Sequence, residues 1–220
     1  MYDYLMGCVP LPNGDIIVAG ITFSNDGDVS GNHSWGSDMW VLKLDSLGNI
    51  IWQHCYGGTA GEQVGINGGS AFIAPTSDKG FLISSLSNSS DGDLTWFYGG
   101  LRDAWIYKID SIGTLLWQRS IGGTDDEFAA VVIEGNNKEN LALITSYSTD
   151  FDLGDVTLYG MADMLLVVLD SAGEITKKLS LGGESKEIGR QIINCSQSGY
   201  LISASSFSQT LIRVSEQCLS

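Results

Sequence analysis

The 220-residue sequence has few of the residues on which catalysis usually depends, with only two histidines and eleven basic residues. His33 and His54 are the side chains best suited to act as bases near neutral pH. Neither recurs in the repeats described below. Nucleophile-elbow, zinc-protease, phosphate-loop and dinucleotide-binding motifs are absent. We therefore expect the chain not to be an enzyme.

Positive charge is scarce: 26 acidic residues against the eleven basic ones leave a formal net charge of −15. This charge would repel nucleic acid and anionic lipid, so we expect no nucleic-acid partner. No apolar run approaches the roughly 18 to 20 residues of a membrane span. The N-terminal residues 1–4 do not begin a basic segment followed by an apolar one, so we expect no signal peptide within this chain.

Cysteine is also rare, and its spacing does not match a metal-binding motif. A disulfide framework would be expected to recur with the repeat, whereas each cysteine occupies a different repeat position. We favour free or buried thiols and keep a single bridge as the alternative. The residues concerned are Cys8, Cys55, Cys195 and Cys218.

The strongest positive feature is an internal repeat. Residues 38–58 read DMWVLKLDSLGNIIWQHCYGG, residues 103–123 read DAWIYKIDSIGTLLWQRSIGG and residues 163–183 read DMLLVVLDSAGEITKKLSLGG. A second block begins at Gly14, Gly80, Asn140 and Gly199. The chain therefore divides into unit 1 (1–58), unit 2 (59–123), unit 3 (124–183) and a truncated unit 4 (184–220).

Each complete unit contains four short apolar runs separated by turn residues, which predicts an all-β fold of four-stranded antiparallel sheets. In the run 40–45, Trp40, Leu42 and Leu44 share one face of the expected strand, opposite Lys43 and Asp45. The next residues, 45–49, predict a hairpin turn. Units of about 55–65 residues fit the blades of a β-propeller, with a β-solenoid as the alternative. Because propellers hold four to eight blades, we expect an incomplete ring rather than a closed four-bladed one.

The segments SNDGDVSGNH, DMWVLKLDSLGNIIWQ and YGG resemble tandem repeats of large secreted surface proteins of the Bacteroidota, many of which end in a type IX secretion sorting domain. The resemblance spans nearly the whole chain. It implies a propeller-like, adhesion-associated protein that is secreted or held at the cell surface. The sorting domain itself is not found in this sequence.

Acidic turns are the first candidate site. Clustered oxygens suit calcium, but neither turn has the complete ligand pattern of an EF-hand, and Asp-Gly is also a common ligand-free hairpin turn. We therefore favour a plain turn and keep calcium as the alternative cofactor. The candidate ligands are Asp26, Asp28, Asp91 and Asp93.

Aromatic and basic residues divide into two groups. Trp40 and Trp52 recur as Trp105 and Trp117, a regularity typical of core packing between blades. Lys43 and Lys108, with Arg213 in unit 4, are expected to pair with neighbouring carboxylates. Trp35 and Trp96 instead lie in the long loops after the acidic turns, where they could contact a glycan.

These features predict a non-catalytic extracellular scaffold or binding platform for protein or glycan ligands. The alternative is a carbohydrate-active enzyme or its accessory domain, since the acidic loops could supply a pair of catalytic carboxylates.

Overall fold

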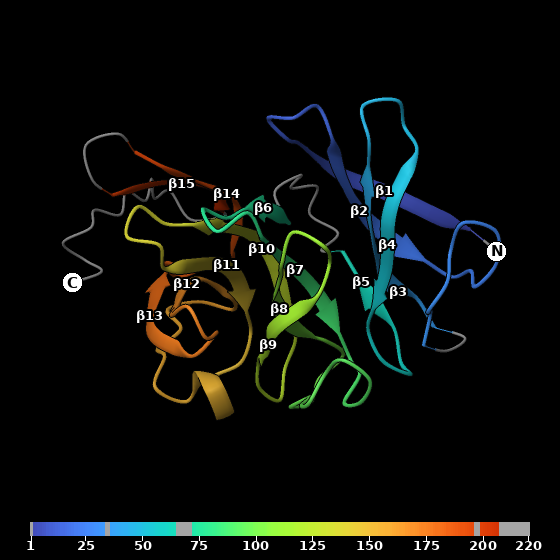
Figure 1. Ribbon diagram of the computed structural model, residues 1–220. Helices are drawn as coiled ribbons and strands as arrows, with labels where there is room; N and C mark the ends of the chain where they lie inside the picture. The colour runs from blue at the N-terminus through green and yellow to red at the C-terminus, as the bar shows by residue number, and fades with distance from the viewer. Residues whose placement is uncertain (1, 34–35, 65–71, 196–198, 207–220) are drawn as a thin grey trace.

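The computed structural model describes residues 2–33, 36–64, 72–195 and 199–206 (Figure 1). Strands dominate this part of the chain, and one short 3₁₀ turn, η1 (Phe151–Leu153), accompanies them. The strands are β1 (Asp3–Pro10), β2 (Ile16–Thr22), β3 (Asp38–Leu44), β4 (Ile50–Tyr56), β5 (Glu62–Gln63), β6 (Ile73–Pro75), β7 (Phe81–Ser87), β8 (Asp103–Ile109), β9 (Leu115–Ile121), β10 (Glu127–Glu134), β11 (Asn140–Ser146), β12 (Asp163–Leu169), β13 (Ile175–Leu181), β14 (Glu187–Asn194) and β15 (Tyr200–Ser206).

The strands form four antiparallel sheets, each within one repeat unit. Units 1 and 3 contain the sheets β1-β2-β3-β4 and β10-β11-β12-β13. In unit 2, β5 and β6 both pair with β7, followed by β8 and β9, and unit 4 contributes β14-β15. The expectation of an all-β, antiparallel fold is confirmed. The antiparallel pairing of all these strands differs from the parallel coils of a β-solenoid.

The predicted hairpin turn between the third and fourth strands is also confirmed. Asp45 Oδ1 accepts hydrogen bonds from the backbone nitrogens of Leu47 and Asn49, both at 2.8 Å. Gly48 has a φ of 87°, in the left-handed region that glycine enters without steric cost. Asp110 and Asp170 accept the corresponding backbone hydrogen bonds in units 2 and 3. The Asp-Ser-x-Gly motif therefore recurs because it builds the same turn.

The sheets pack on one another in chain order, and each contact has its own apolar cluster (Figure 1). Met39 and Val41 of unit 1 share a cluster with Trp105 and Tyr107 of unit 2. A second cluster joins units 2 and 3, and a third joins units 3 and 4. The alternating faces of each middle strand thus contact the two neighbouring units, which explains why β8 and β12 are buried along their whole length.

Trp52, Trp105 and Trp117 pack between units as expected, whereas Trp40 packs within unit 1 against Val29 and Leu42, and the two lysines pair with carboxylates as expected. Trp105 is fully buried and Trp40 nearly so, while Trp52 and Trp117 are half-buried against the cores. Lys43 Nζ lies 3.2 Å from a carboxylate oxygen of Asp15, and Lys108 Nζ lies 2.5 Å from one of Asp78. Arg213 lies outside the described residues.

Three of the four cysteines lie in the described residues. Cys8 is exposed, Cys55 and Cys195 are half-buried, and none of these three is bridged. Burial is the main reason that the pKa of the Cys55 thiol is raised to about 12. Cys218 lies outside the described residues. Among the described residues, no helix is long and apolar enough to cross a membrane.

Candidate functional site

The acidic turns hold neighbouring units together. Asp91 accepts hydrogen bonds from the backbone nitrogen and the hydroxyl of Thr59, at 2.7 and 2.6 Å. Asp93 Oδ2 accepts a third from the backbone nitrogen of Gly57, at 3.1 Å. In unit 3, Asp150 binds Thr124 in the same two ways. The acidic turn of one unit thus fixes the Gly-Gly-Thr turn at its boundary with the unit before it.

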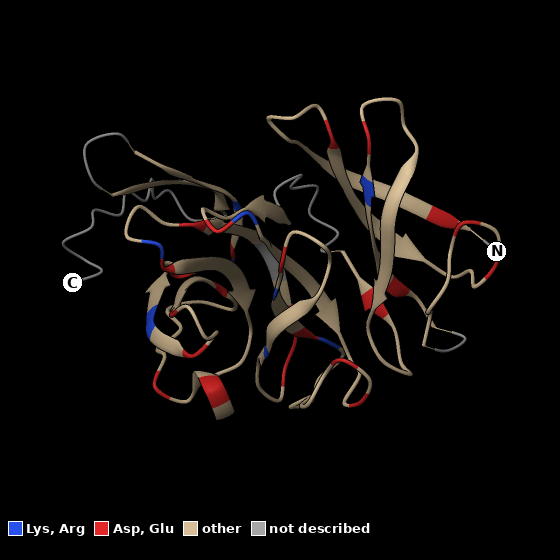
Figure 2. Cartoon of the chain, in the orientation of Figure 1, with Lys and Arg blue, Asp and Glu red and all other residues tan. Residues whose placement is uncertain are grey.

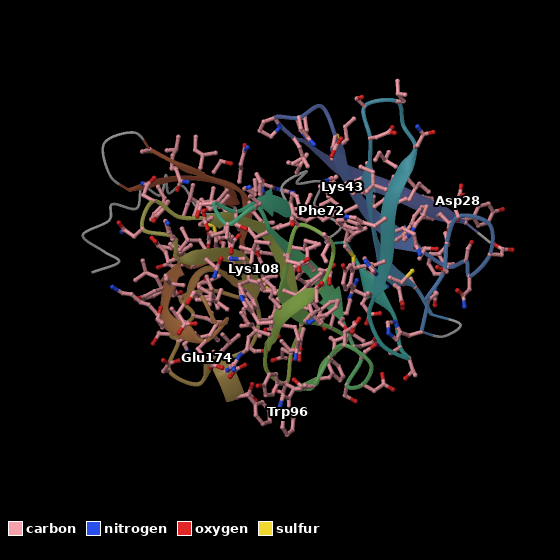
Figure 3. All side chains as sticks on the ribbon, in the orientation of Figure 1. Asp28, Lys43, Phe72, Trp96, Lys108 and Glu174 are labelled. Carbon is pink, nitrogen blue, oxygen red and sulfur yellow. The ribbon has the colours of Figure 1, made fainter. Side chains whose placement is uncertain are left out.

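In unit 1, the side-chain carboxylates of Asp26 and Asp28 accept no hydrogen bond from the described residues, and only the backbone oxygen of Asp26 accepts one, from the Val29 nitrogen at 3.1 Å. Figure 3 shows Asp28 at the outer edge of the molecule, on the side of the N-terminus. No group of three or more His, Cys, Asp or Glu residues in the described ranges is placed to hold a metal ion. A calcium site at Asp26, Asp28, Asp91 and Asp93 stays a prediction.

Each junction between units also buries two carboxyl groups that sequence reasoning did not pair. At the second junction, between units 2 and 3, the two carboxyl groups lie on either side of Gly122. A Cβ atom added to this glycine would lie 2.3 Å from Asp103 Oδ1 and 2.6 Å from Glu127 Oε2. Asp38 and Glu62 flank Gly57 in the same way. Burial, the largest cause in each case, raises the pKa of Glu62, Asp103 and Glu127 to about 7.

The glutamates at these junctions already accept several hydrogen bonds. Glu127 accepts one from the backbone nitrogen of Gly123 and one from the Ser146 hydroxyl. The aspartates differ, because one buried oxygen of each has no partner among the described residues; these atoms are Oδ1 of Asp38, Asp103 and Asp163. As a nearby like charge, Asp103 adds to the rise in the pKa of Glu127.

His33 belongs to the first junction, between units 1 and 2, where carboxylates bind it. Its Nδ1 lies 2.6 Å from Asp38 Oδ2 and its Nε2 lies 3.8 Å from Asp93 Oδ2. Burial alone would lower the pKa of His33, but the hydrogen bond and charge of Asp38 raise it above its ordinary value. The arrangement favours a protonated imidazole held between carboxylates. His54 instead lies among the rings of Trp52 and Tyr56.

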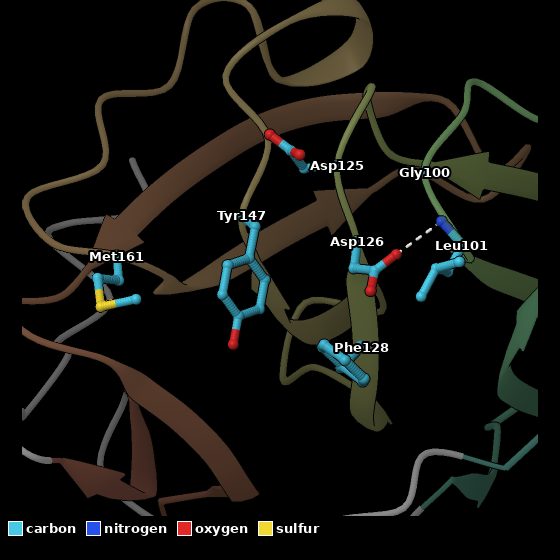
Figure 4. Close-up of a pocket in the computed structure, with 7 residues that line it drawn as sticks. All are labelled: Gly100, Leu101, Asp125, Asp126, Phe128, Tyr147 and Met161. Carbon is cyan, nitrogen blue, oxygen red and sulfur yellow. Dashed lines mark hydrogen bonds between the residues drawn. The ribbon is translucent and has the colours of Figure 1, made fainter.

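A pocket of about 540 Å³ opens to solvent between the loops of units 2 and 3 (Figure 4). This volume lies within the range of small-molecule sites. Two half-buried aromatic rings, two carboxylates and two exposed apolar side chains surround it. The lining residues are Gly100, Leu101, Asp125, Asp126, Phe128, Tyr147 and Met161.

The pocket's aromatic rings are held by their neighbours. Phe128 at the start of β10 and Tyr147 just after β11 have ring centroids 6.1 Å apart in an edge-to-face arrangement. Lys186 Nζ lies 4.9 Å from the Tyr147 centroid and 5.7 Å from that of Phe128. Arg102 lies over Phe128 at 5.6 Å. These cation–π contacts favour fixed ring positions and place hydrogen-bond donors near the rim.

The carboxylates of the pocket have different tasks. Asp126 Oδ1 accepts a hydrogen bond of 2.7 Å from the backbone nitrogen of Leu101, which ties the loop of unit 2 to unit 3 (Figure 4). Asp125 is exposed, and within the described ranges only its backbone nitrogen makes a hydrogen bond, which it donates to the Ser148 hydroxyl. Its carboxylate is therefore free to accept hydrogen bonds from a ligand.

Of the two loop tryptophans expected to contact a ligand, Trp96 is 66% exposed and lies outside the pocket lining. Figure 3 places it at the rim of the molecule, pointing away from the body. Trp35 lies outside the described residues. Sequence reasoning missed Phe128 and Tyr147 because it followed what recurs. Strand pairing shows that Gln63 and Asn88 occupy the equivalent positions in unit 2. The replacement of these polar residues by aromatic ones in unit 3 was the signal that could have revealed the pocket.

A second hollow, of about 700 Å³, lies among the hairpin turns of units 1 and 2. Pro10, Leu11, Pro12 and Pro75 give it a mainly apolar wall, with Lys43 and Lys79 at its edge. It has neither the exposed carboxylate nor the facing aromatic rings of the first pocket. We therefore take the pocket around Phe128 and Tyr147 as the candidate site.

Comparison with known proteins supplies no identity. No family model matches the chain, and no curated protein matches it. Among solved structures, it is similar to a protein of unknown function from Bacteroides caccae, with 14% sequence identity and a TM-score of 0.45. The similarity covers 74% of this chain and 46% of that one, so this chain spans less than half of its neighbour's length. At this level of similarity we draw nothing further from it.

Proposed function

We propose that the four units are consecutive blades of an extracellular β-propeller that acts as a non-catalytic binding platform, with a glycan as its ligand. Four antiparallel sheets that stack in chain order support the blade assignment. The resemblance to secreted surface proteins of the Bacteroidota supports the extracellular location.

The pocket around Phe128 and Tyr147 is the observation that carries the glycan proposal. A sugar ring presents C–H groups on its faces and hydroxyl groups around its edge. Aromatic faces carry partial negative charge and attract such C–H groups. The free carboxylate of Asp125 can accept two hydroxyl hydrogen bonds, and Lys186 and Arg102 can donate to hydroxyl oxygens. The pocket thus offers both kinds of contact that a neutral sugar requires.

The overall charge agrees with a neutral rather than an anionic glycan. The chain carries a formal charge of −15, and Figure 2 shows acidic residues on all four units with few basic ones between them. Long-range repulsion would slow the approach of a polyanion. A neutral oligosaccharide escapes this repulsion and still uses every group in the pocket.

A glycan array probed with the labelled chain tests the proposal. We expect binding to one family of neutral glycans, lost or weakened about tenfold or more in Phe128→Ala and Tyr147→Ala, as for truncated aromatic hot spots. Tyr159→Ala is the matched control, since Tyr159 is 63% exposed and lies outside the pocket lining. Binding by the wild type that survives both pocket substitutions would refute the site. No binding to any glycan, with capture of a protein ligand that needs Tyr147, would replace the glycan by a protein.

A further inference from the structure

The junction between units 2 and 3 carries a pair of aromatic rings beside the candidate pocket. Tyr98, in the loop between β7 and β8, and Phe151, at the start of η1, have ring centroids 5.3 Å apart, with an angle of 32° between the ring planes. Figure 1 shows η1 and this loop at the same edge of the molecule. Phe151 is 60% exposed and Tyr98 is half-buried. The pair therefore presents aromatic surface to solvent.

Phe151 holds a backbone conformation that a phenylalanine seldom adopts. Its φ is 47°, in the left-handed region where a residue with a bulky side chain is strained. Gly27 and Gly92 occupy the same place in the acidic turns of units 1 and 2, with φ of 64° and 68°. Burial does not offset the strain of Phe151, because most of its side chain is exposed. Strain at an exposed residue favours a function for the side chain itself.

The junction between units 1 and 2 forms without either ring. His33 occupies the position of Tyr98 there, because the backbone nitrogen of each donates to the first aspartate of the following strand. Gly92 occupies the position of Phe151, and the acidic turn binds the preceding Gly-Gly-Thr turn through the same two hydrogen bonds at both junctions. The packing of one unit on the next therefore does not require aromatic side chains at these two positions.

The ring pair and the pocket are built by the same segments. The loop of Tyr98 continues directly into the pocket lining. Phe151 follows Asp150, which accepts a hydrogen bond of 2.9 Å from the backbone nitrogen of Thr124. The residue after this threonine is Asp125, whose free carboxylate lines the pocket. Two Cα steps of about 3.8 Å each and one hydrogen bond thus connect the two features, so a chain of several sugar residues can reach both.

We propose that Tyr98 and Phe151 form a second sugar-binding subsite next to the pocket, so that the protein binds its glycan as an extended chain of several sugar residues. This inference rests on the proposed function of the pocket. The pocket holds one sugar, and the exposed ring of Phe151 stacks on the C–H groups of a further sugar in the same chain. Contact with the Tyr98 ring fixes the orientation of Phe151.

Isothermal titration calorimetry with neutral oligomers of glucose, galactose, mannose, xylose and N-acetylglucosamine, from disaccharides to hexasaccharides, tests the proposal. We expect one series to bind the wild type with an affinity that rises about tenfold or more with length, as a second aromatic contact is engaged. Phe151→Gly restores the residue of units 1 and 2 and is expected to lose this gain with length. Tyr147→Ala, in the pocket, is expected to lose binding at every length.

Tyr159→Ala is the matched control for the ring pair. The backbone nitrogen of Tyr159 donates to Asp163 as that of Tyr98 does to Asp103, so Tyr159 occupies the same position in unit 3. We expect Tyr98→Ala to reduce the gain with length and Tyr159→Ala to retain it. Equal effects of the two substitutions would contradict a subsite at the junction between units 2 and 3.

Thermal unfolding separates a role in binding from a role in folding. Because glycine adopts a φ of 47° without strain, Phe151→Gly is expected to keep the melting temperature of the wild type or to raise it by up to about 4 °C. Phe151→Ala also removes the ring but keeps a Cβ atom in the strained region, so it should bind like Phe151→Gly and melt at a lower temperature. A Phe151→Gly protein that melts several degrees below the wild type would show that the ring is structural and would overturn the proposal.

The titration also distinguishes failure of the second subsite from failure of the pocket. Affinity that does not depend on length in the wild type, or a length dependence that survives in Phe151→Gly, would overturn the subsite and leave the pocket in place. No binding by any oligomer, or capture of a protein ligand instead, would refute the glycan and the second subsite with it.

Discussion

The buried carboxyl pairs predict that the protein loses stability as the pH rises from 5.5 to 8.5. The groups that titrate in this window include Glu62, Asp103 and Glu127, whose pKa values burial raises to about 7, and His33, whose pKa is also raised. A raised pKa means that the folded state binds more protons than the unfolded one in this window. The free energy of unfolding therefore falls with rising pH.

The magnitude follows from Asp103, at the junction between units 2 and 3, whose pKa burial raises to about 7. An unfolded aspartate ionises near pH 4 and the folded Asp103 near pH 7, so at pH 5.5 the folded state holds a proton that the unfolded chain has lost. Releasing this proton by pH 8.5 costs about 2 kcal/mol of stability. Asp103 is 1% exposed, so solvent screening does not reduce the figure. The first junction adds a loss of similar size.

Asp103→Asn is the matched variant. An asparagine at this position cannot ionise, and its amide oxygen can still accept the hydrogen bond that the Tyr98 backbone nitrogen donates to Asp103 Oδ2, at 2.7 Å. Urea unfolding at pH 5.5 and 8.5 should show a loss about 2 kcal/mol smaller in the variant, with His33 contributing equally to both proteins. A wild type that gains stability over this range, or an unchanged pH dependence in Asp103→Asn, would refute the raised pKa of Asp103.

Two further predictions concern packing, and thermal or urea unfolding measures both. Gly58→Ala should destabilise the protein by about 1 to 3 kcal/mol, because the added Cβ would lie 2.6 Å from the backbone oxygen of Asp91. The control Gly61→Ala, with its nearest atom at 3.5 Å, should change stability by less than about 0.5 kcal/mol, and equal effects would contradict the close contact between the turns. Ile106→Ala should cost about 2 to 5 kcal/mol, since Ile106 is 0% exposed between units 2 and 3. Ile112→Ala, at a position 65% exposed, should be nearly neutral, and a similarly small effect of Ile106→Ala would argue against a packed interface there.

Features that recur in the sequence predicted the structure well. Alternation in the run 40–45 indicated a strand with Trp40 and Leu42 on one face, and both belong to the same apolar cluster. The turn after Asp45 follows from local hydrogen bonding within a few residues, so the sequence of a single unit was enough to predict it.

Features that depend on contacts between units could not be predicted in the same way. The acidic turn at Asp91 is a hairpin motif in isolation, and its partner Thr59 lies 32 residues earlier, in the bend between β4 and β5. Glu127 and Asp103 were visible as acidic residues, but their pairing depends on how two sheets stack. The pocket residues Phe128 and Tyr147 do not recur, because unit 2 has polar residues at their positions. Predicting the pocket would have required attention to departures from the repeat rather than to the repeat itself.

A methyl NMR titration of the chain labelled at its methionines tests the glycan site most directly. Met161 lines the pocket and is 76% exposed, whereas Met39 is buried between units 1 and 2 and serves as the internal reference. With a neutral glycan selected on the array, the account predicts that the Met161 methyl resonance, assigned with Met161→Leu, shifts to saturation while that of Met39 stays in place. Saturable binding that leaves the Met161 resonance unmoved would contradict it.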